Sequence, residues 1–253
     1  VPRIVSTRSV WSRSPGEVRG TLEDSEQHDV HEAFDILINK CNEVDREAAV
    51  QALQVPVQSR HQMDIAMEST SPFAKTLGGM SQTSVTCNAC GVTSPTENEF
   101  FHCLQMAIPT SANASIEGIF FEHWGVEPLD DTCDNPACAT RGRRTKKSLL
   151  VRWPKVLLVT LKRWKIESQT PYLLRKDPAH VVFKMVWPAA HNRPPYELRA
   201  IVVHAGDAGG GHYTAYVRAQ ESGWYCCDDA CRPRRVSEAE VLHAEAYLLF
   251  YES

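Results

Sequence analysis

The sequence has no run of apolar residues that approaches the roughly 20 needed to cross a bilayer as a helix. It also lacks a strong charge of either sign, since the formal net charge is −4 and the pI is about 6.2. We therefore expect no membrane span, and nothing in the charge favours nucleic acid or an anionic membrane as a partner. The basic run at residues 141–147 is interpreted as a solvated loop rather than a binding patch.

Cysteine is missing from residues 1–40, although the chain has nine cysteines in all. The odd number, and the close spacing of four of them, favour a metal site over disulfides. We therefore expect a reducing compartment, either the cytoplasm or the nucleus. With 253 residues, of which 43% are hydrophobic, the chain is long enough for one large domain or two small ones.

Four of the cysteines form two closely spaced pairs, namely Cys87 with Cys90 and Cys133 with Cys138. Four thiolates are suitable for a structural zinc site, which is tetrahedral and closed by protein ligands. Because residues 91–132 separate the pairs, we expect two β-hairpins that run together and meet at their tips. The alternative is four reduced cysteines without metal. His123 and Cys103 are less suitable as ligands because neither lies in a paired turn.

A histidine and an acid are predicted to face each other near residue 220. Two aromatic and β-branched segments flank the polar residues 219–223, a pattern typical of a hairpin. With the fold-back near Gln220, His212 and Asp228 lie directly opposite, with Cβ atoms roughly 4.5–5.5 Å apart. That distance would let the carboxylate orient the imidazole, as in a nucleophile–His–Asp arrangement.

The same segment resembles the histidine box of the ubiquitin-specific proteases, which are papain-like deubiquitinating enzymes. The resemblance lies in the Gly-His-Tyr-x-x-Tyr run that begins at Gly211 and the Trp-Tyr-x-x-Asp-Asp run that begins at Trp224. With the strands predicted at 196–206 and 246–252, it covers residues 196–252. It implies that His212 is the catalytic base and Asp228 its orienter. Asp229 is the alternative orienter, or assists the oxyanion region.

An amphipathic helix is predicted at residues 26–41, with Ser25 as its cap. Its apolar positions at helical spacing are Val30, Ala33, Phe34 and Leu37. The segment resembles the family's Gln-Gln-Asp-Ala-His-Glu-Phe motif beside the catalytic cleft. The resemblance implies that the basic tail of ubiquitin is bound by Gln27, Asp29, Glu32, Gly211 and Tyr213. Ubiquitin or a ubiquitinated protein is therefore the expected partner.

The resemblance also implies the fold, an α+β papain-like domain. We expect a single domain at 1–253, with the remainder of a helical thumb at 1–75, zinc-tipped fingers at 76–150 and a β-sheet palm at 151–253. Val156–Leu161 is predicted to be a buried strand because it is short, apolar and β-branched. Residues from Gly79 to Thr96 and from Pro188 to Pro195 are expected to be loops.

The nucleophile that this family requires has no obvious counterpart in the sequence. The family places it in an Asn-x-Gly-Asn-Thr-Cys block ahead of the Gln-Gln-Asp motif, where this chain has no cysteine. Cys41 is predicted near a helix C-terminus, where the dipole disfavours a thiolate. One explanation is that the cysteine lies upstream of a fragment. The others are a pseudoenzyme that binds ubiquitin, and a structural subunit of a larger complex.

Overall fold

The computed structural model describes most of the chain after residue 70 and one helix before it. The described residues are 29–39, 41, 71–94, 97–110, 114–138, 143–169, 172–189, 193–207, 210–219 and 222–253. No helix in these segments is long and apolar enough to cross a membrane. The elements mix sheets with short helices, so the predicted α+β class is confirmed.

The larger sheet, here called the palm sheet, has eight strands. In spatial order they are β13 (Arg234–Val236), β12 (Gly223–Cys227), β11 (Gly210–Ala219), β10 (Tyr196–Asp207), β14 (Ala246–Glu252), β6 (Val156–Lys162) and β3 (Cys103–Ala107), with β9 (Val186–Trp187) also paired to β10. Neighbouring strands are antiparallel except β3 and β6, which are parallel. The strands predicted at 156–161, 196–206 and 246–252 are all present.

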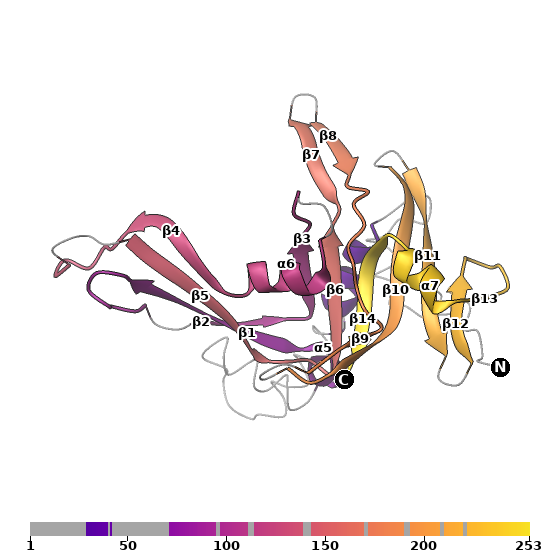
Figure 1. The fold of residues 1–253 in the computed structure, drawn as a ribbon, viewed down its shortest axis with the longest axis horizontal. Helices are drawn as coiled ribbons and strands as arrows, with labels where there is room; N and C mark the ends of the chain where they lie inside the picture. The colour runs from indigo at the N-terminus through magenta and orange to yellow at the C-terminus, as the bar shows by residue number, and fades with distance from the viewer. Residues whose placement is uncertain are drawn as a thin grey trace.

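The second sheet, here called the finger sheet, extends away from the palm sheet (Figure 1). Its order is β2 (Glu97–Phe101), β1 (Gly79–Cys87), β5 (Arg143–Arg152) and β4 (Val126–Thr132). The prediction of a loop at Gly79–Thr96 is wrong for residues 79–87. These residues are rich in Ser and Thr, and they form a strand because they pair with neighbours on both sides.

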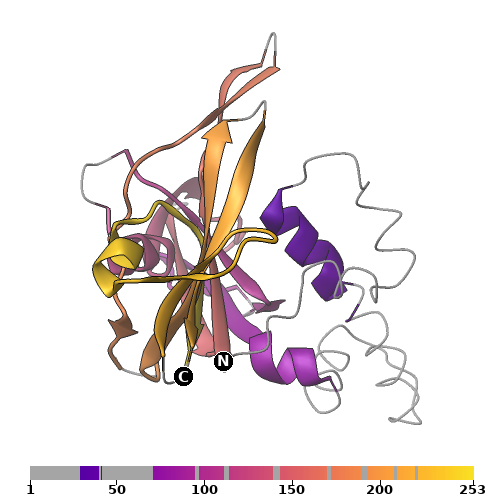
Figure 2. The same cartoon turned by 90° about the vertical axis from the view of Figure 1, so that its right-hand side faces the viewer.

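Helices cover both faces of the palm sheet (Figure 2). One face carries the helix at residues 30–39 and α5 (Pro72–Leu77), and the other carries α6 (Ile116–His123) and α7 (Glu238–His243). The central strands β6 and β14 are therefore buried on both faces, which explains the continuous apolar run seen in β6. The main core contains Leu157, Val159 and Leu249.

The helix at residues 30–39 starts later than expected. Asp29, not Ser25, is its cap: Asp29 Oδ1 accepts the backbone N–H of His31 at 2.8 Å. Val30 and Phe34 pack on the palm sheet beside Tyr247, as the spacing predicted. Leu37 is exposed instead, and Ile38 is buried. Ser25 itself lies outside the described residues.

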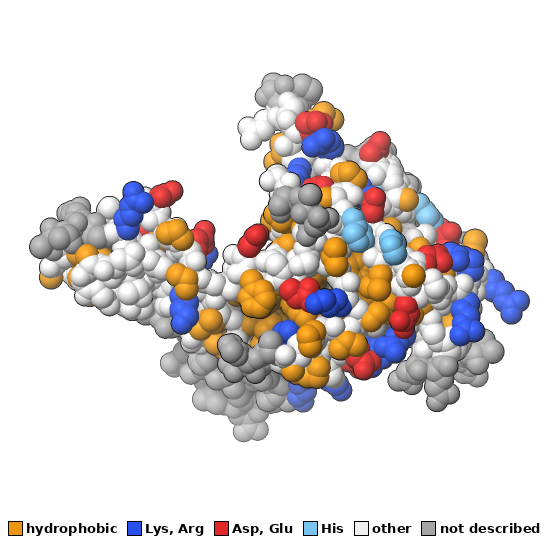
Figure 3. Space-filling view, viewed as in Figure 1, with side chains coloured by type: hydrophobic (Ala, Val, Ile, Leu, Met, Phe, Trp, Pro, Cys, Tyr) orange, Lys and Arg blue, Asp and Glu red, His pale blue; other side chains and the backbone are white. Residues whose placement is uncertain are grey.

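A two-stranded hairpin, β7 (Trp164–Gln169) and β8 (Tyr172–Lys176), stands out from the end of β6 (Figure 1). The surface between this hairpin and the finger sheet is hollowed (Figure 3). Near the base of the hairpin, β10 turns into β11, the strand that carries the predicted catalytic histidine.

Candidate functional site

His212 and Asp228 are brought together at the open end of the β11–β12 hairpin, because His212 lies near the start of β11 and Asp228 directly follows β12. His212 Nε2 lies 2.5 Å from Asp228 Oδ1. Each side chain is 47% exposed, so the pair faces an open surface. Because the Asp228 carboxylate accepts a hydrogen bond from Nε2–H, Nδ1 is the ring nitrogen left to exchange a proton with a substrate or nucleophile.

The predicted register of this hairpin is wrong by two residues. Ala215 is paired with Cys227 and Ala219 with Gly223, so the ladder, extended, would place Asp228 opposite Thr214. The contact with His212 is a diagonal one, which the reach of the two side chains still allows. A fold-back at Gln220 would pair Gly223 with Val217, but Gly223, the first residue of β12, pairs with Ala219 instead.

Asp229 sits on the other side of the imidazole. Its Oδ2 lies 4.0 Å from His212 Nδ1, and its backbone has a φ of 41°. A left-handed backbone is tolerated by Asp better than by most residues. It turns the chain sharply after Asp228, and the backbone N–H of Cys231 closes the turn on the Asp228 carbonyl at 2.8 Å.

The hydrogen bond that His212 donates to Asp228 raises the pKa of His212 above its usual value, and burial opposes this only in part. The imidazolium is the form that both carboxylates favour. The arrangement therefore holds a histidine of fixed orientation with a strengthened affinity for a proton, as a general base requires.

A thiol partner for His212 is absent from the described residues, which include all nine cysteines. The group of His, Cys, Asp and Glu polar atoms within 4.8 Å of one another contains His212, Asp228 and Asp229 and no sulfur. Burial raises the pKa of Cys103 to about 12 and also raises the pKa of Cys226 and Cys227. These environments disfavour a reactive thiolate.

Asp29 joins its helix to the palm sheet through its carboxylate. Asp29 Oδ2 accepts hydrogen bonds from Tyr247 OH at 2.7 Å and from Trp164 Nε1 and Tyr213 OH at 3.2 Å each. Oδ1 meanwhile caps the helix. Tyr213 is one of the residues that the sequence indicates, whereas Trp164 and Tyr247 carry no local signal because only the folded chain brings them to Asp29.

The other residues expected to contact the ubiquitin tail are Gln27, Glu32 and Gly211. Glu32 is exposed on the same helix, and Gln27 lies outside the described residues. Gly211 packs so closely on His204 that an added Cβ would collide with the imidazole ring. The His204 ring in turn lies 4.6 Å from that of Tyr213, centroid to centroid. Glycine at 211 therefore lets β10 and β11 approach with both rings in place.

The two cysteine pairs meet at the tip of the finger sheet, as predicted. Cys87 ends β1, whereas Cys133 and Cys138 lie between β4 and β5. These three sulfurs and that of Cys90 lie within 4.8 Å of one another and are here called the four-cysteine cluster. The wider second turn closes because Cys138 N–H reaches the Asn135 carbonyl at 2.9 Å. The cluster includes neither of the alternative ligands, Cys103 and His123.

The spacing of these sulfurs fits a tetrahedral metal ion. The Sγ atoms of Cys87 and Cys138 are 3.9 Å apart, and those of Cys90 and Cys133 are 3.8 Å apart. Four sulfurs about 2.3 Å from one zinc ion would be separated by about 3.8 Å. Backbone N–H groups of Cys90 and Ala89 lower the pKa of Cys87 to about 6. Burial and the neighbouring thiols instead raise the pKa of Cys133, because thiolates this close repel one another unless a cation lies between them.

Solved structures with the same fold come from a deubiquitinating assembly. A chain of the SAGA DUB module bound to monoubiquitin superposes with a TM-score of 0.74 at 23% identity, covering 96% of this chain and 51% of that one. A chain of the yeast SAGA DUB module gives 0.72 at 24% identity, covering 88% and 50%. The expected ubiquitin-specific protease fold is thereby confirmed.

Sequence relatives carry the same family name. Ubiquitin carboxyl-terminal hydrolase 5 of Saccharomyces cerevisiae is 30% identical over 66% of this chain and 23% of its own length. Ubiquitin carboxyl-terminal hydrolase 21 of Rattus norvegicus is 32% identical over 69% of this chain and 32% of its own length. The chain thus spans about a quarter to a third of these relatives. The sequence model of ubiquitin carboxyl-terminal hydrolases matches residues 3–251. The chain belongs to that family, among its ubiquitin-specific proteases.

Proposed function

We propose that the chain is the greater part of a catalytic domain, single over residues 1–253, that hydrolyses the bond after the terminal glycine of ubiquitin. The observation that carries this proposal is the His212–Asp228 pair, with its 2.5 Å hydrogen bond, in a chain of this family. Since none of the nine cysteines is grouped with His212, the nucleophilic cysteine is proposed to come from outside these residues.

The proposed reaction is acyl transfer with His212 as base and then acid. Nδ1 would take the thiol proton as sulfur attacks the glycine carbonyl, and would return it to the lysine amine when the C–N bond breaks. Water would then cleave the thioester. Asp228 would hold the ring through Nε2, and Asp229 would stabilise the imidazolium from the Nδ1 side.

We propose that ubiquitin lies against the finger sheet, with its tail between the helix at 30–39 and β11. One face of the finger sheet leaves Val126, Leu149 and Val151 exposed, which is apolar area that a partner would cover. Along the tail's path, Asp29, Glu32, Gly211 and Tyr213, together with Gln27, are the proposed contacts. A larger assembly is also proposed, because the structures that share the fold belong to one.

The four-cysteine cluster is proposed to bind structural zinc. Its sulfur spacing and the N–H groups around Cys87 support this assignment. Asn135 Nδ2 also points at Cys90 Sγ from 3.9 Å, as an outer partner of a thiolate would. Zinc held by thiolates is in keeping with a reducing compartment, the cytoplasm or the nucleus.

The second candidate function is a ubiquitin-binding pseudoenzyme. This function is favoured by the observation that, among the described residues, no thiol belongs to the His212 group. The two are separated by hydrolysis of a fluorogenic ubiquitin conjugate with the full-length polypeptide that contains this chain. We expect turnover by the wild type, its loss in His212→Ala, and retained ubiquitin binding in both. The exposed His180→Ala is the matched control and should remain active.

A wild-type polypeptide that binds ubiquitin without hydrolysing the conjugate would select the pseudoenzyme. Equal hydrolysis by wild type and His212→Ala would reject His212 as the base. A protein with no affinity for ubiquitin would reject both functions and leave a purely structural subunit.

A further inference from the structure

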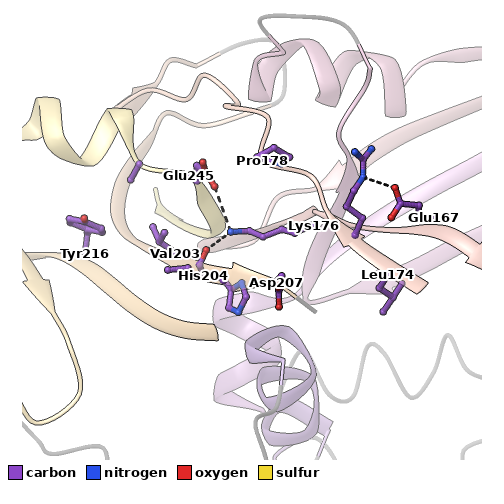
Figure 4. Close-up of a pocket in the computed structure, with 13 residues that line it drawn as sticks. Glu167, Leu174, Lys176, Pro178, Val203, His204, Asp207, Tyr216 and Glu245 are labelled. Atoms are coloured by element: carbon purple, nitrogen blue, oxygen red, sulfur yellow. Dashed lines mark hydrogen bonds and ion pairs between the residues drawn. The ribbon is translucent and has the colours of Figure 1, made fainter. Parts of the chain in front are cut away.

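A single lysine joins the protruding β7–β8 hairpin to the strand opposite His212. Lys176, the last residue of β8, donates from Nζ to the backbone carbonyl of His204. The same ammonium lies 3.5 Å from Glu245 Oε2 (Figure 4). Its side chain is only 11% exposed, so the cation is largely removed from water. These three groups are here called the Lys176 link.

The His204 carbonyl that Lys176 contacts lies just beyond the point where the pairing of β10 with β14 ends. β14 pairs with β10 only as far as Val203, which faces Ala246. β10 continues beyond that point and stays paired with β11 up to Asp207. On its β14 side, the backbone at His204 therefore has no partner among the described strands, and Lys176 supplies the donor that a strand would have supplied.

The position of this carbonyl bears directly on His212. The His204 carbonyl belongs to the peptide unit that leads into Ala205, and Ala205 is paired with His212 across the β10–β11 ladder. His204 itself is paired with Tyr213. A bond that fixes the His204 peptide thus fixes the piece of backbone against which His212 is aligned.

We propose that Lys176 is a positioning residue for His212, acting through the His204 peptide and held in place by Glu245. The inference rests on the proposed function of His212. The Lys176 link borders an open cavity of about 640 Å³, whose lining includes Pro178, Val203 and Tyr216. Side-chain packing alone therefore would not hold the His204 peptide in place if the link were lost. Without the ammonium, water would take the place of the side-chain donor at this peptide.

The hairpin itself has a separate anchor. The buried Arg163 guanidinium donates to the carbonyls of Ala246 at 2.8 Å and Asp177 at 2.9 Å, at the base of the hairpin. Lys165 adds an ion pair of 2.6 Å to Asp177. Loss of the Lys176 link should therefore leave the hairpin and the fold intact while loosening the backbone beside His212.

The test compares Lys176→Met with Arg175→Met. Arg175 is the preceding residue of β8, and its side chain is exposed and paired only loosely, at 3.7 Å, with Glu167. Both variants remove one cation from the same strand, but only Lys176→Met removes the donor to His204. Lys176→Arg keeps a cationic donor and serves as the rescue.

The first measurement is an NMR titration of the His212 imidazole in the present chain. We expect the midpoint in Lys176→Met to fall toward the ordinary value of about 6.5, as the contact with Asp228 loosens. Arg175→Met should titrate like the wild type, and Lys176→Arg should lie close to it. In the full-length enzyme, kcat should fall about 10- to 100-fold in Lys176→Met, with KM little changed.

A His212 midpoint in Lys176→Met equal to that in Arg175→Met would overturn the proposal, and so would equal losses of kcat. If Lys176→Met does not fold, Glu245→Gln replaces it: a smaller downward shift is then expected, and no shift overturns the proposal. If the full-length wild type hydrolyses no ubiquitin conjugate, the proposed function fails, but the titration still decides whether Lys176 positions His212.

Discussion

The finger sheet and the palm sheet are stabilised in different ways. In the palm sheet, five consecutive residues of β6 are buried, and β14 is buried along most of its length. In the finger sheet, β4 has no fully buried residue and β5 has two. The buried cluster at the far end of the finger sheet consists of Cys87, Cys133 and Cys138. Apolar side chains thus fill the core of the palm sheet, whereas the buried residues at the tip of the fingers are cysteines.

The strongest test of this contrast is to remove the zinc ion that we propose for the four-cysteine cluster. Structural zinc sites contribute about 10–16 kcal/mol of apparent binding free energy in zinc-finger peptides. We expect about one zinc per chain, and chelation should abolish hydrogen-exchange protection in β1 and β5 while β6 and β14 stay protected. Elemental analysis and exchange mass spectrometry measure both. Cys90→Ser should act like the chelator, and Cys231→Ser, outside the cluster, should not. Unchanged protection of the fingers without metal would contradict the assignment.

A second change addresses the palm sheet alone. Leu249 is fully buried in the main core, so Leu249→Ala should lower the free energy of unfolding by about 2–5 kcal/mol. The finger sheet should keep its metal. Urea unfolding gives the stability, and Leu173→Ala, at a half-exposed position of β8, should change it by less than about 0.5 kcal/mol. Release of zinc by Leu249→Ala at low urea would show that the two sheets do not behave separately.

The smallest expected effect is at the exposed end of the palm sheet. Asp228 raises the pKa of His212, so the folded state binds a proton more tightly than the unfolded state. The resulting stabilisation is complete below about pH 6.5, the unfolded value, and is lost as pH rises through the raised folded pKa. Asp228→Asn should abolish this dependence and lower the His212 midpoint in an NMR titration.

Asp130→Asn removes an exposed carboxylate from the finger sheet and is the control for that titration. It should leave the His212 midpoint unchanged. A midpoint that stays raised in Asp228→Asn would assign the shift to Asp229, whose Oδ2 lies 4.0 Å from Nδ1.

The sequence was informative where a local pattern determines the structure. Buried strands such as β6 show as continuous apolar runs, and close pairs such as Cys87 and Cys90 show as ligand spacing. It was misleading at β1, because a Ser- and Thr-rich strand has no apolar signature and is held by β2 and β5 on either side. The helix at residues 30–39 buries Ile38 and exposes Leu37, the reverse of what the spacing predicts. Both side chains are compatible with the helix, and only tertiary packing selects which of them is buried.

In the candidate site, too, local patterns were predictable from the sequence and contacts between distant segments were not. His212 and Asp228 lie close together in sequence and were found from the hairpin pattern, although the exact register depended on where the turn begins. The three side-chain donors to Asp29 come from β7, β11 and β14, far away in the chain. Contacts of that kind depend on topology, which no periodicity in the sequence reports.

The position of β14 has a consequence for how the protein is made. β14 is the last of the described strands in the chain, yet it lies between β10 and β6 in the palm sheet. While the ribosome is still adding residues before 246, both of those strands have an open, apolar edge and cannot be joined. Nascent chains with such edges are prone to aggregation. The palm sheet can therefore close only after β14 has left the exit tunnel, and until then the edges of β10 and β6 stay unpaired.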